Sequence, residues 1–123
     1  MSKKILFAED EEVLLRSLTE ILTQEGYDVT GVMDGESAIE QVTKNNPDLI
    51  LLDLILPKKD GFEVLKSLKA GETTKHIPVI VLTNLESLGD ISRALEAGAS
   101  AYLVKANYDL EDVLKKIEAV LGT

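Results

Sequence analysis

The sequence predicts an α/β fold in which helices cover both faces of a doubly wound, five-stranded parallel sheet. Short apolar runs alternate with longer segments of helical period, and the apolar runs are continuous rather than alternating. Continuous apolarity indicates burial on both faces of a strand, as in a parallel sheet. No linker or repeat interrupts this pattern, so we expect residues 1–123 to form a single domain.

Five segments are predicted as strands. Four are short apolar runs and one is half polar; in chain order they are 5–8, 27–32, 49–52, 79–82 and 102–104. The half-polar segment, 27–32, suits an edge of the sheet. For five parallel strands with right-handed crossovers, the order 2-1-3-4-5 is a common arrangement, and we expect it here.

Five segments are predicted as helices because apolar residues recur in them at spacings of three and four. They are 12–25, 36–44, 62–69, 87–97 and 110–121. Asp34 and Asp109 are predicted to cap the second and fifth helices, since a short carboxylate can accept hydrogen bonds from the first turn. Asp112 stands where the acid of a capping box would stand.

Composition and charge exclude several classes of function. The net charge is −9, from 22 acidic and 13 basic residues, which argues against direct binding to nucleic acid or an anionic membrane. No apolar run approaches the roughly 20 residues that span a bilayer, and the first residues reach Glu9 before a signal-peptide core could form. The chain has no cysteine, which favours a reducing setting, so we expect a cytoplasmic location.

Carboxylates follow two strands that should be neighbours. Glu9 and Asp10 follow the first strand and Asp53 follows the third. Open α/β sheets bind ligands at the carboxyl ends of the strands where the strand order reverses, which here lies between those two strands. Like charges so close require a cation, and oxygen ligands favour Mg²⁺, with Mn²⁺ as an alternative.

The fourth and fifth strands supply a hydroxyl and an ammonium group to the same edge, from Thr83 and Lys105. A divalent metal and a lysine can neutralise the oxygens of a phosphoryl group, a hydroxyl can donate to one of them, and a carboxylate can act as the nucleophile. The pattern therefore indicates a site that holds a phosphoryl group on Asp53.

Four motifs in this order resemble the receiver domain of two-component response regulators. They are 7–11 (FAEDE), 52–61 (LDLILPKKDG), 81–83 (VLT) and 102–105 (YLVK), and the resemblance extends from Lys4 to about Leu121. The resemblance implies a flavodoxin-like (βα)5 sandwich with strand order 2-1-3-4-5. It also implies a signalling domain that catalyses only its own phosphorylation and dephosphorylation.

The resemblance further implies a role for each site residue. Asp53 would accept phosphate from a histidine kinase or a histidine phosphotransfer protein. Mg²⁺ would be held by Glu9, Asp10, Asp53 and the backbone carbonyl of Ile55.

At the other half of the site, Thr83 and Lys105 would contact the phosphoryl group. Tyr102 would move inward with Thr83 as the switch of the active state. The protein-binding surface of the helix 87–97, the strand 102–104 and the helix 110–121 would then change for a downstream effector protein.

Alternatives remain open at this point. Asn84 and Ala106 stand where the family usually has a small residue and a proline. They leave room for a phosphorylation-independent, receiver-like interaction module. A flavin-binding protein is disfavoured because the acidic loop after the first strand would repel phosphate. A haloacid-dehalogenase-type hydrolase would need a second acid where Ile55 stands.

The surface prompts two smaller expectations. Val13 lies off the apolar stripe of the first helix and Leu15 lies at its margin, so we hypothesise that both belong to a docking patch for the phosphodonor. Lys58 and Lys59 are expected to be solvated loop charges.

Overall fold

The computed structural model describes residues 2–83, 88–104 and 109–122, and only the backbone of Thr83, Leu88 and Leu110. Strands and helices alternate along this part of the chain. They are β1 (Lys4–Ala8), α1 (Glu12–Gln24), β2 (Asp28–Val32), α2 (Gly35–Asn45), β3 (Leu49–Asp53), α3 (Gly61–Ala70), β4 (Val79–Thr83), α4 (Leu88–Glu96), β5 (Ala101–Val104) and α5 (Leu110–Leu121).

The strands form a parallel sheet in the order β2-β1-β3-β4-β5, which confirms the predicted topology. The strand ends differ from the predicted ones by one residue at most. The half-polar strand β2 lies at an edge, as expected. Two of its five residues are half-buried and the others are exposed, whereas all five residues of β3 are buried.

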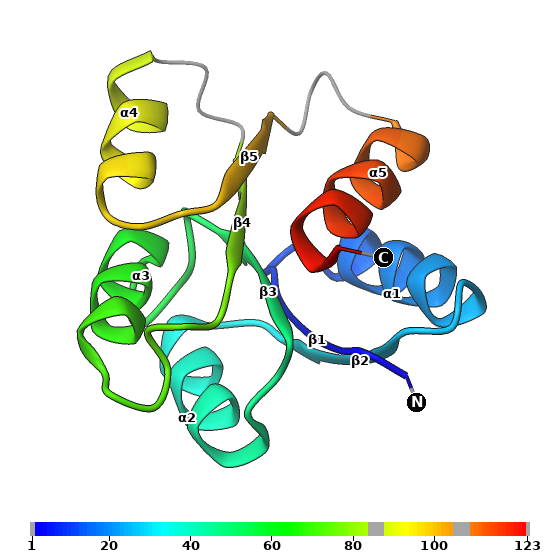
Figure 1. Ribbon diagram of the computed structural model, residues 1–123, viewed down its shortest axis with the longest axis horizontal. Coiled ribbons are helices and arrows are strands. Elements are labelled where there is room, and N and C mark those ends of the chain that lie inside the picture. The colour runs from blue at the N-terminus through cyan, green and yellow to red at the C-terminus, as the bar shows by residue number, and fades with distance from the viewer. Residues whose placement is uncertain (1, 84–87, 105–108, 123) are drawn as a thin grey trace.

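Two hydrophobic cores lie on opposite faces of the sheet. Figure 1 shows α1 and α5 together on one face and α2, α3 and α4 on the other. Successive strand residues alternate between the cores: Leu6 belongs to the core under α2, α3 and α4, and Phe7 to the core under α1 and α5. Burial on both faces is therefore the reason that the central strands are continuously apolar.

Side-chain caps define where α2, α3 and α5 begin, whereas α1 has no side-chain cap. The Asp34 carboxylate accepts a hydrogen bond from the Ser37 N–H at 2.8 Å, and Asp109 and Asp112 form the predicted capping box. Asp60 caps α3 by accepting from the Glu63 N–H at 3.1 Å. These caps fix the first turns of three helices that begin at the carboxyl end of the sheet.

No helix in the described part of the chain combines the length and the apolarity that crossing a bilayer requires.

Candidate functional site

Three carboxylates converge at the carboxyl ends of β1 and β3. Ala8 pairs with Leu52 in the sheet, so the residues that follow them, Glu9 and Asp53, emerge side by side. One carboxylate oxygen each from Glu9, Asp10 and Asp53 lie within 4.8 Å of one another. The predicted convergence of these side chains is confirmed.

The cluster is buried on one side and open on the other. Glu9 is 0% exposed and Asp53 is 3% exposed, whereas Asp10 is exposed. Backbone N–H groups orient the two buried carboxylates: Glu11 N donates to Glu9 Oε2 at 3.0 Å, and Ile55 N donates to Asp53 Oδ1 at 3.1 Å. A ligand from solvent can therefore approach two carboxylates whose positions the backbone already fixes.

The cluster fits a hard divalent cation. All three side chains offer carboxylate oxygens, the ligands that Mg²⁺ prefers. Oxygen ligands around Mg²⁺ lie about 3 to 4 Å apart, so a small movement of side chains would suffice to complete a shared coordination sphere. Buried carboxylates this close repel one another, and a cation between them would offset that repulsion.

Residues 54–60, which we call the site loop, connect β3 to α3. Gly61 N donates to the Leu54 carbonyl oxygen at 2.9 Å. A Cβ built on Gly61 would overlap the Asp53 carbonyl oxygen, so only glycine lets α3 begin this close to the end of β3. Within the loop, Ile55 is 56% exposed while Leu56 is buried, which directs the two side chains to opposite sides.

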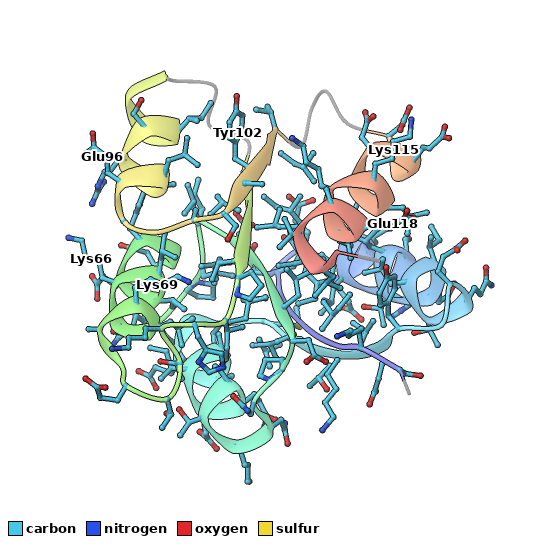
Figure 2. All side chains as sticks on the ribbon, in the orientation of Figure 1. Lys66, Lys69, Glu96, Tyr102, Lys115 and Glu118 are labelled. Carbon is cyan, nitrogen blue, oxygen red and sulfur yellow. The ribbon has the colours of Figure 1, made fainter. Side chains whose placement is uncertain are left out.

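The other half of the expected site is only partly described. Thr83 ends β4, next to β3 and β5, but its side chain lies outside the described part of the structure. Lys105, Asn84 and Ala106 also lie outside the described residues. Tyr102 is 38% exposed on β5, and Figure 2 shows its side chain pointing outward.

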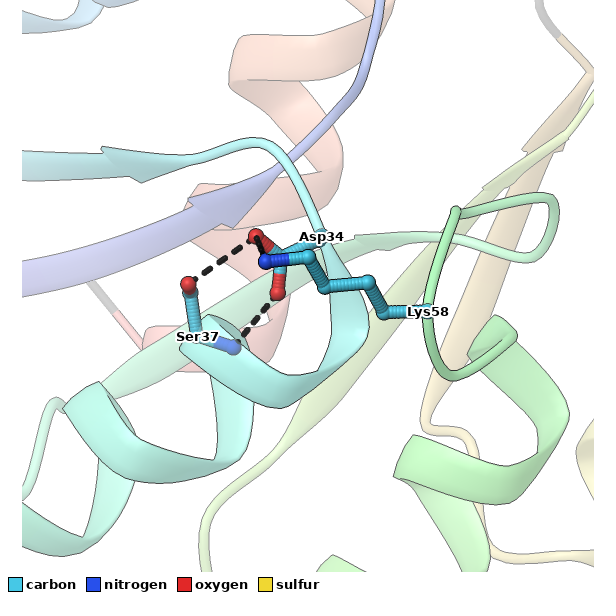
Figure 3. Close-up of polar contacts among 3 residues, drawn as sticks. All are labelled: Asp34, Ser37 and Lys58. Carbon is cyan, nitrogen blue, oxygen red and sulfur yellow. Dashed lines mark hydrogen bonds and ion pairs between the residues drawn. The ribbon is translucent and has the colours of Figure 1, made fainter.

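The docking patch expected at Val13 and Leu15 stays a hypothesis. Val13, in the first turn of α1, is 79% exposed, whereas Leu15 is half-buried and packs against the core under α1 and α5. Lys58 is solvated as expected, with its side chain 62% exposed, and its Nζ also lies 3.9 Å from Asp34 Oδ2 (Figure 3), whereas Lys59 is half-buried. The sequence predicts Asp34 only as a helix cap. Its contact with a lysine 24 positions later could not be predicted from the neighbouring residues.

Comparison with known proteins decides the family. Residues 5–118 match the response regulator receiver domain. The chain belongs to this family.

Similar proteins include response regulator PleD of Caulobacter vibrioides, which is 43% identical over 114 residues, covering 93% of this chain and 24% of PleD. The chain spans about half the length of other curated relatives, such as the PhoP regulator of Bacillus subtilis, with 38% identity over 98% of this chain and 49% of PhoP. Among solved structures, the receiver domain of a Pseudomonas aeruginosa sensor histidine kinase, with magnesium in its active-site cleft, has a TM-score of 0.90, 30% identity and full coverage of both chains.

The phosphorylated cyanobacterial phytochrome response regulator superimposes with a TM-score of 0.83 and 34% identity, covering 98% of this chain and 91% of that one. Family membership and these receivers assign the chain a phosphorylation-receiver role in two-component signalling. The phosphorylation-independent module is not favoured.

Proposed function

We propose that Asp53 is the phosphoacceptor of a receiver domain spanning residues 1–123. The observation that carries the proposal is the cluster of Glu9, Asp10 and Asp53 at the point where the strand order reverses. Asp53 is the most central of the three because it is the last residue of the fully buried strand β3. The magnesium-containing and the phosphorylated receivers that this fold resembles support the same assignment.

Four groups would hold Mg²⁺: the side chains of Glu9, Asp10 and Asp53 and the backbone carbonyl of Ile55. When bound, Mg²⁺ supplies positive charge that neutralises the transferring phosphoryl oxygens. The Ile55 N–H, which donates to Asp53 Oδ1, keeps the carboxylate in one orientation. A nucleophile fixed in this way loses little conformational freedom when the donor arrives.

The transfer step joins Asp53 to phosphorus. A carboxylate oxygen attacks the phosphorus of a phosphohistidine, the P–O bond forms and the P–N bond breaks. The electron pair of the P–N bond stays on the imidazole nitrogen, which is protonated from solvent. The product is an aspartyl phosphate on this chain and an unmodified histidine on the donor.

The remaining residues would read the phosphoryl group. Thr83 and Lys105 would contact its oxygens, and Tyr102 would move inward with Thr83. The surface formed by α4, β5 and α5 would then bind a downstream effector protein, because the phosphorylated chain favours a different conformation. We place this exchange between a histidine kinase or phosphotransfer protein and an effector in the cytoplasm.

Intact-mass spectrometry after incubation with acetyl phosphate and Mg²⁺ tests the proposal. We expect the wild-type chain to gain the mass of one phosphoryl group, and both Asp53→Asn and a chelator to abolish the gain. Asp48→Asn, at an exposed carboxylate that precedes β3, is the matched control and should be labelled normally. Labelling of Asp53→Asn to the wild-type extent would contradict the assignment of Asp53.

A further inference from the structure

The first residues of α2 contact the site loop. Neither helix capping nor the phosphoacceptor chemistry by itself requires this contact. We propose that Gly35, held in place by the Asp34 cap, is a positioning residue that sets the site loop for Mg²⁺ binding. This inference rests on the proposed function, since it takes the Ile55 carbonyl as a metal ligand. It assigns the start of α2 a role in the affinity of the site for its cation.

The contact between α2 and the site loop joins backbone to backbone. Gly35 N donates to the Pro57 carbonyl oxygen at 3.2 Å. A Cβ built on Gly35 would overlap the Lys59 carbonyl oxygen and lie 2.9 Å from Lys59 Cβ. A residue larger than glycine would therefore push the loop away from the helix, because a backbone carbonyl cannot rotate aside as a side chain can.

Between these contacts, the site loop adopts an unusual backbone conformation. Lys58 has φ of +68°, in the left-handed region that lysine disfavours. The bend is closed by Lys59 N, which donates to the Pro57 carbonyl oxygen at 2.8 Å. Neighbouring contacts must hold such a conformation, and those to α2 are among them.

The ion pair between Lys58 and Asp34 is the weaker part of this contact. Its atoms are 3.9 Å apart and the lysine side chain is 62% exposed, so solvent screens the attraction. Figure 3 shows that Asp34 also accepts hydrogen bonds from the Ser37 N–H and hydroxyl, at 2.8 and 3.0 Å. Asp34 thus mainly fixes the start of α2, and the close approach at Gly35 positions the loop.

The position of the Ile55 carbonyl depends on both ends of this short loop. Gly61 N holds the Leu54 carbonyl on one side, and Gly35 N holds the Pro57 carbonyl on the other. Ile55 lies between these two anchors. Displacing Pro57 would shift the Ile55 carbonyl, which on the proposed function is the fourth metal ligand, and misplaced ligands weaken metal binding.

Gly35→Ala tests the inference, with the Mg²⁺ dissociation constant measured by titration calorimetry. Alanine favours helices more than glycine does, so weaker binding cannot come from lower helix propensity. We expect the dissociation constant to rise about tenfold, the scale of losses outside the ligand set. Val42→Ala removes a buried side chain from the same helix, and should lower the melting temperature while leaving Mg²⁺ affinity unchanged.

Two outcomes separate this inference from the proposed function. If wild-type protein binds Mg²⁺ and Gly35→Ala binds it equally well, Gly35 does not position the loop and the inference fails alone. If wild-type protein does not bind Mg²⁺, the proposed function fails and the inference fails with it. Equal loss of affinity in Gly35→Ala and Val42→Ala would also overturn the inference, because general destabilisation would then explain both.

Hydrogen exchange on the wild-type protein gives a test that needs no variant to fold. Coupling is reciprocal, so a contact that favours Mg²⁺ binding must itself be strengthened by Mg²⁺. We expect saturating Mg²⁺ to slow exchange of the Gly35 amide several-fold. The Asn46 amide, which donates to the Val42 carbonyl at the other end of α2, is the internal control and should not change. An unchanged rate at Gly35 would overturn the proposal.

Discussion

Charged side chains at the two ends of the sheet are arranged in opposite ways. At the carboxyl end, Glu9, Asp10 and Asp53 bring like charges within 4.8 Å of one another. At the amino end, charges bind backbone: Asp48 Oδ2 accepts from Lys4 N at 2.8 Å, and Lys69 Nζ donates to the Lys75 and Ile77 carbonyls at 3.1 and 2.7 Å.

The difference separates charges that stabilise the fold from charges whose arrangement suits a bound cation. A charge that bonds to backbone contributes to the stability of the chain by itself. Like charges held together reduce stability until something of opposite sign binds. Mutations at the two ends should therefore change the free energy of unfolding in opposite directions.

Lys69→Met should have the largest effect on stability. The methionine keeps an aliphatic side chain but loses both hydrogen bonds to carbonyls. Burial lowers the pKa of Lys69 and offsets part of what these bonds contribute, so we expect a loss of about 2 kcal/mol in the free energy of unfolding, measured in urea. Lys66, labelled beside Lys69 in Figure 2, is exposed on the same helix. Lys66→Met is the control, and an equal loss in both variants would argue against a role for the carbonyl contacts.

Asp10→Asn should act in the opposite direction at the carboxyl end. Without divalent metal, removal of one like charge should raise the free energy of unfolding slightly. Mg²⁺ at ten times its dissociation constant should stabilise the wild-type chain by about 1.4 kcal/mol, and should stabilise Asp10→Asn much less. Thermal unfolding with and without Mg²⁺ checks both expectations. If Mg²⁺ stabilised the two proteins equally, Asp10 would not be a ligand of the metal.

The smallest effect concerns the pH dependence of the Asp34 cap. The hydrogen bond from the Ser37 N–H, assisted by the Ser37 hydroxyl and the Lys58 ammonium, holds the pKa of Asp34 below its ordinary value of 3.8, although burial opposes this. A lowered pKa means that the stabilisation is present above 3.8 and is lost as the pH falls through the folded-state pKa.

Asp34→Ser isolates this effect because serine also caps helices but does not titrate. We expect the wild-type chain to lose part of its stability advantage over Asp34→Ser below about pH 3.8 and to keep it at neutral pH. Urea unfolding of both proteins, below about pH 3.8 and at neutral pH, measures this difference in stability. A stability difference that does not change with pH would show that the Asp34 charge is not coupled to folding.

Much of the fold and part of the site could be predicted because the signals are local or follow from strand order. Burial on both faces makes β3 apolar throughout, and a carboxylate at its end is conspicuous for that reason. The predicted strand order placed β1 beside β3 in parallel, so the residues that follow the two strands were expected to lie close together. The caps at Asp34 and Asp109 depend only on the next turn of their own helices.

Contacts between segments far apart in sequence could not be predicted in this way. Gly35 approaches Lys59 across 24 positions, and nothing in the neighbourhood of either residue indicates the other. In the sequence, Lys69 is an ordinary lysine near the end of a helix. The structure shows that carbonyl groups in the turn before β4 accept hydrogen bonds from its ammonium group. The α2 C-cap, Asn46, adopts φ of +46° without the glycine that usually signals a left-handed helix end.

The edge strand β2 also affects how copies of this chain behave toward one another. Its outer side offers backbone groups that another strand could pair with, which is a route to aggregation. Asp28 and Gly31 are both exposed there, and neither residue favours an added strand. Together with a net charge of −9, this edge should keep crowded molecules apart.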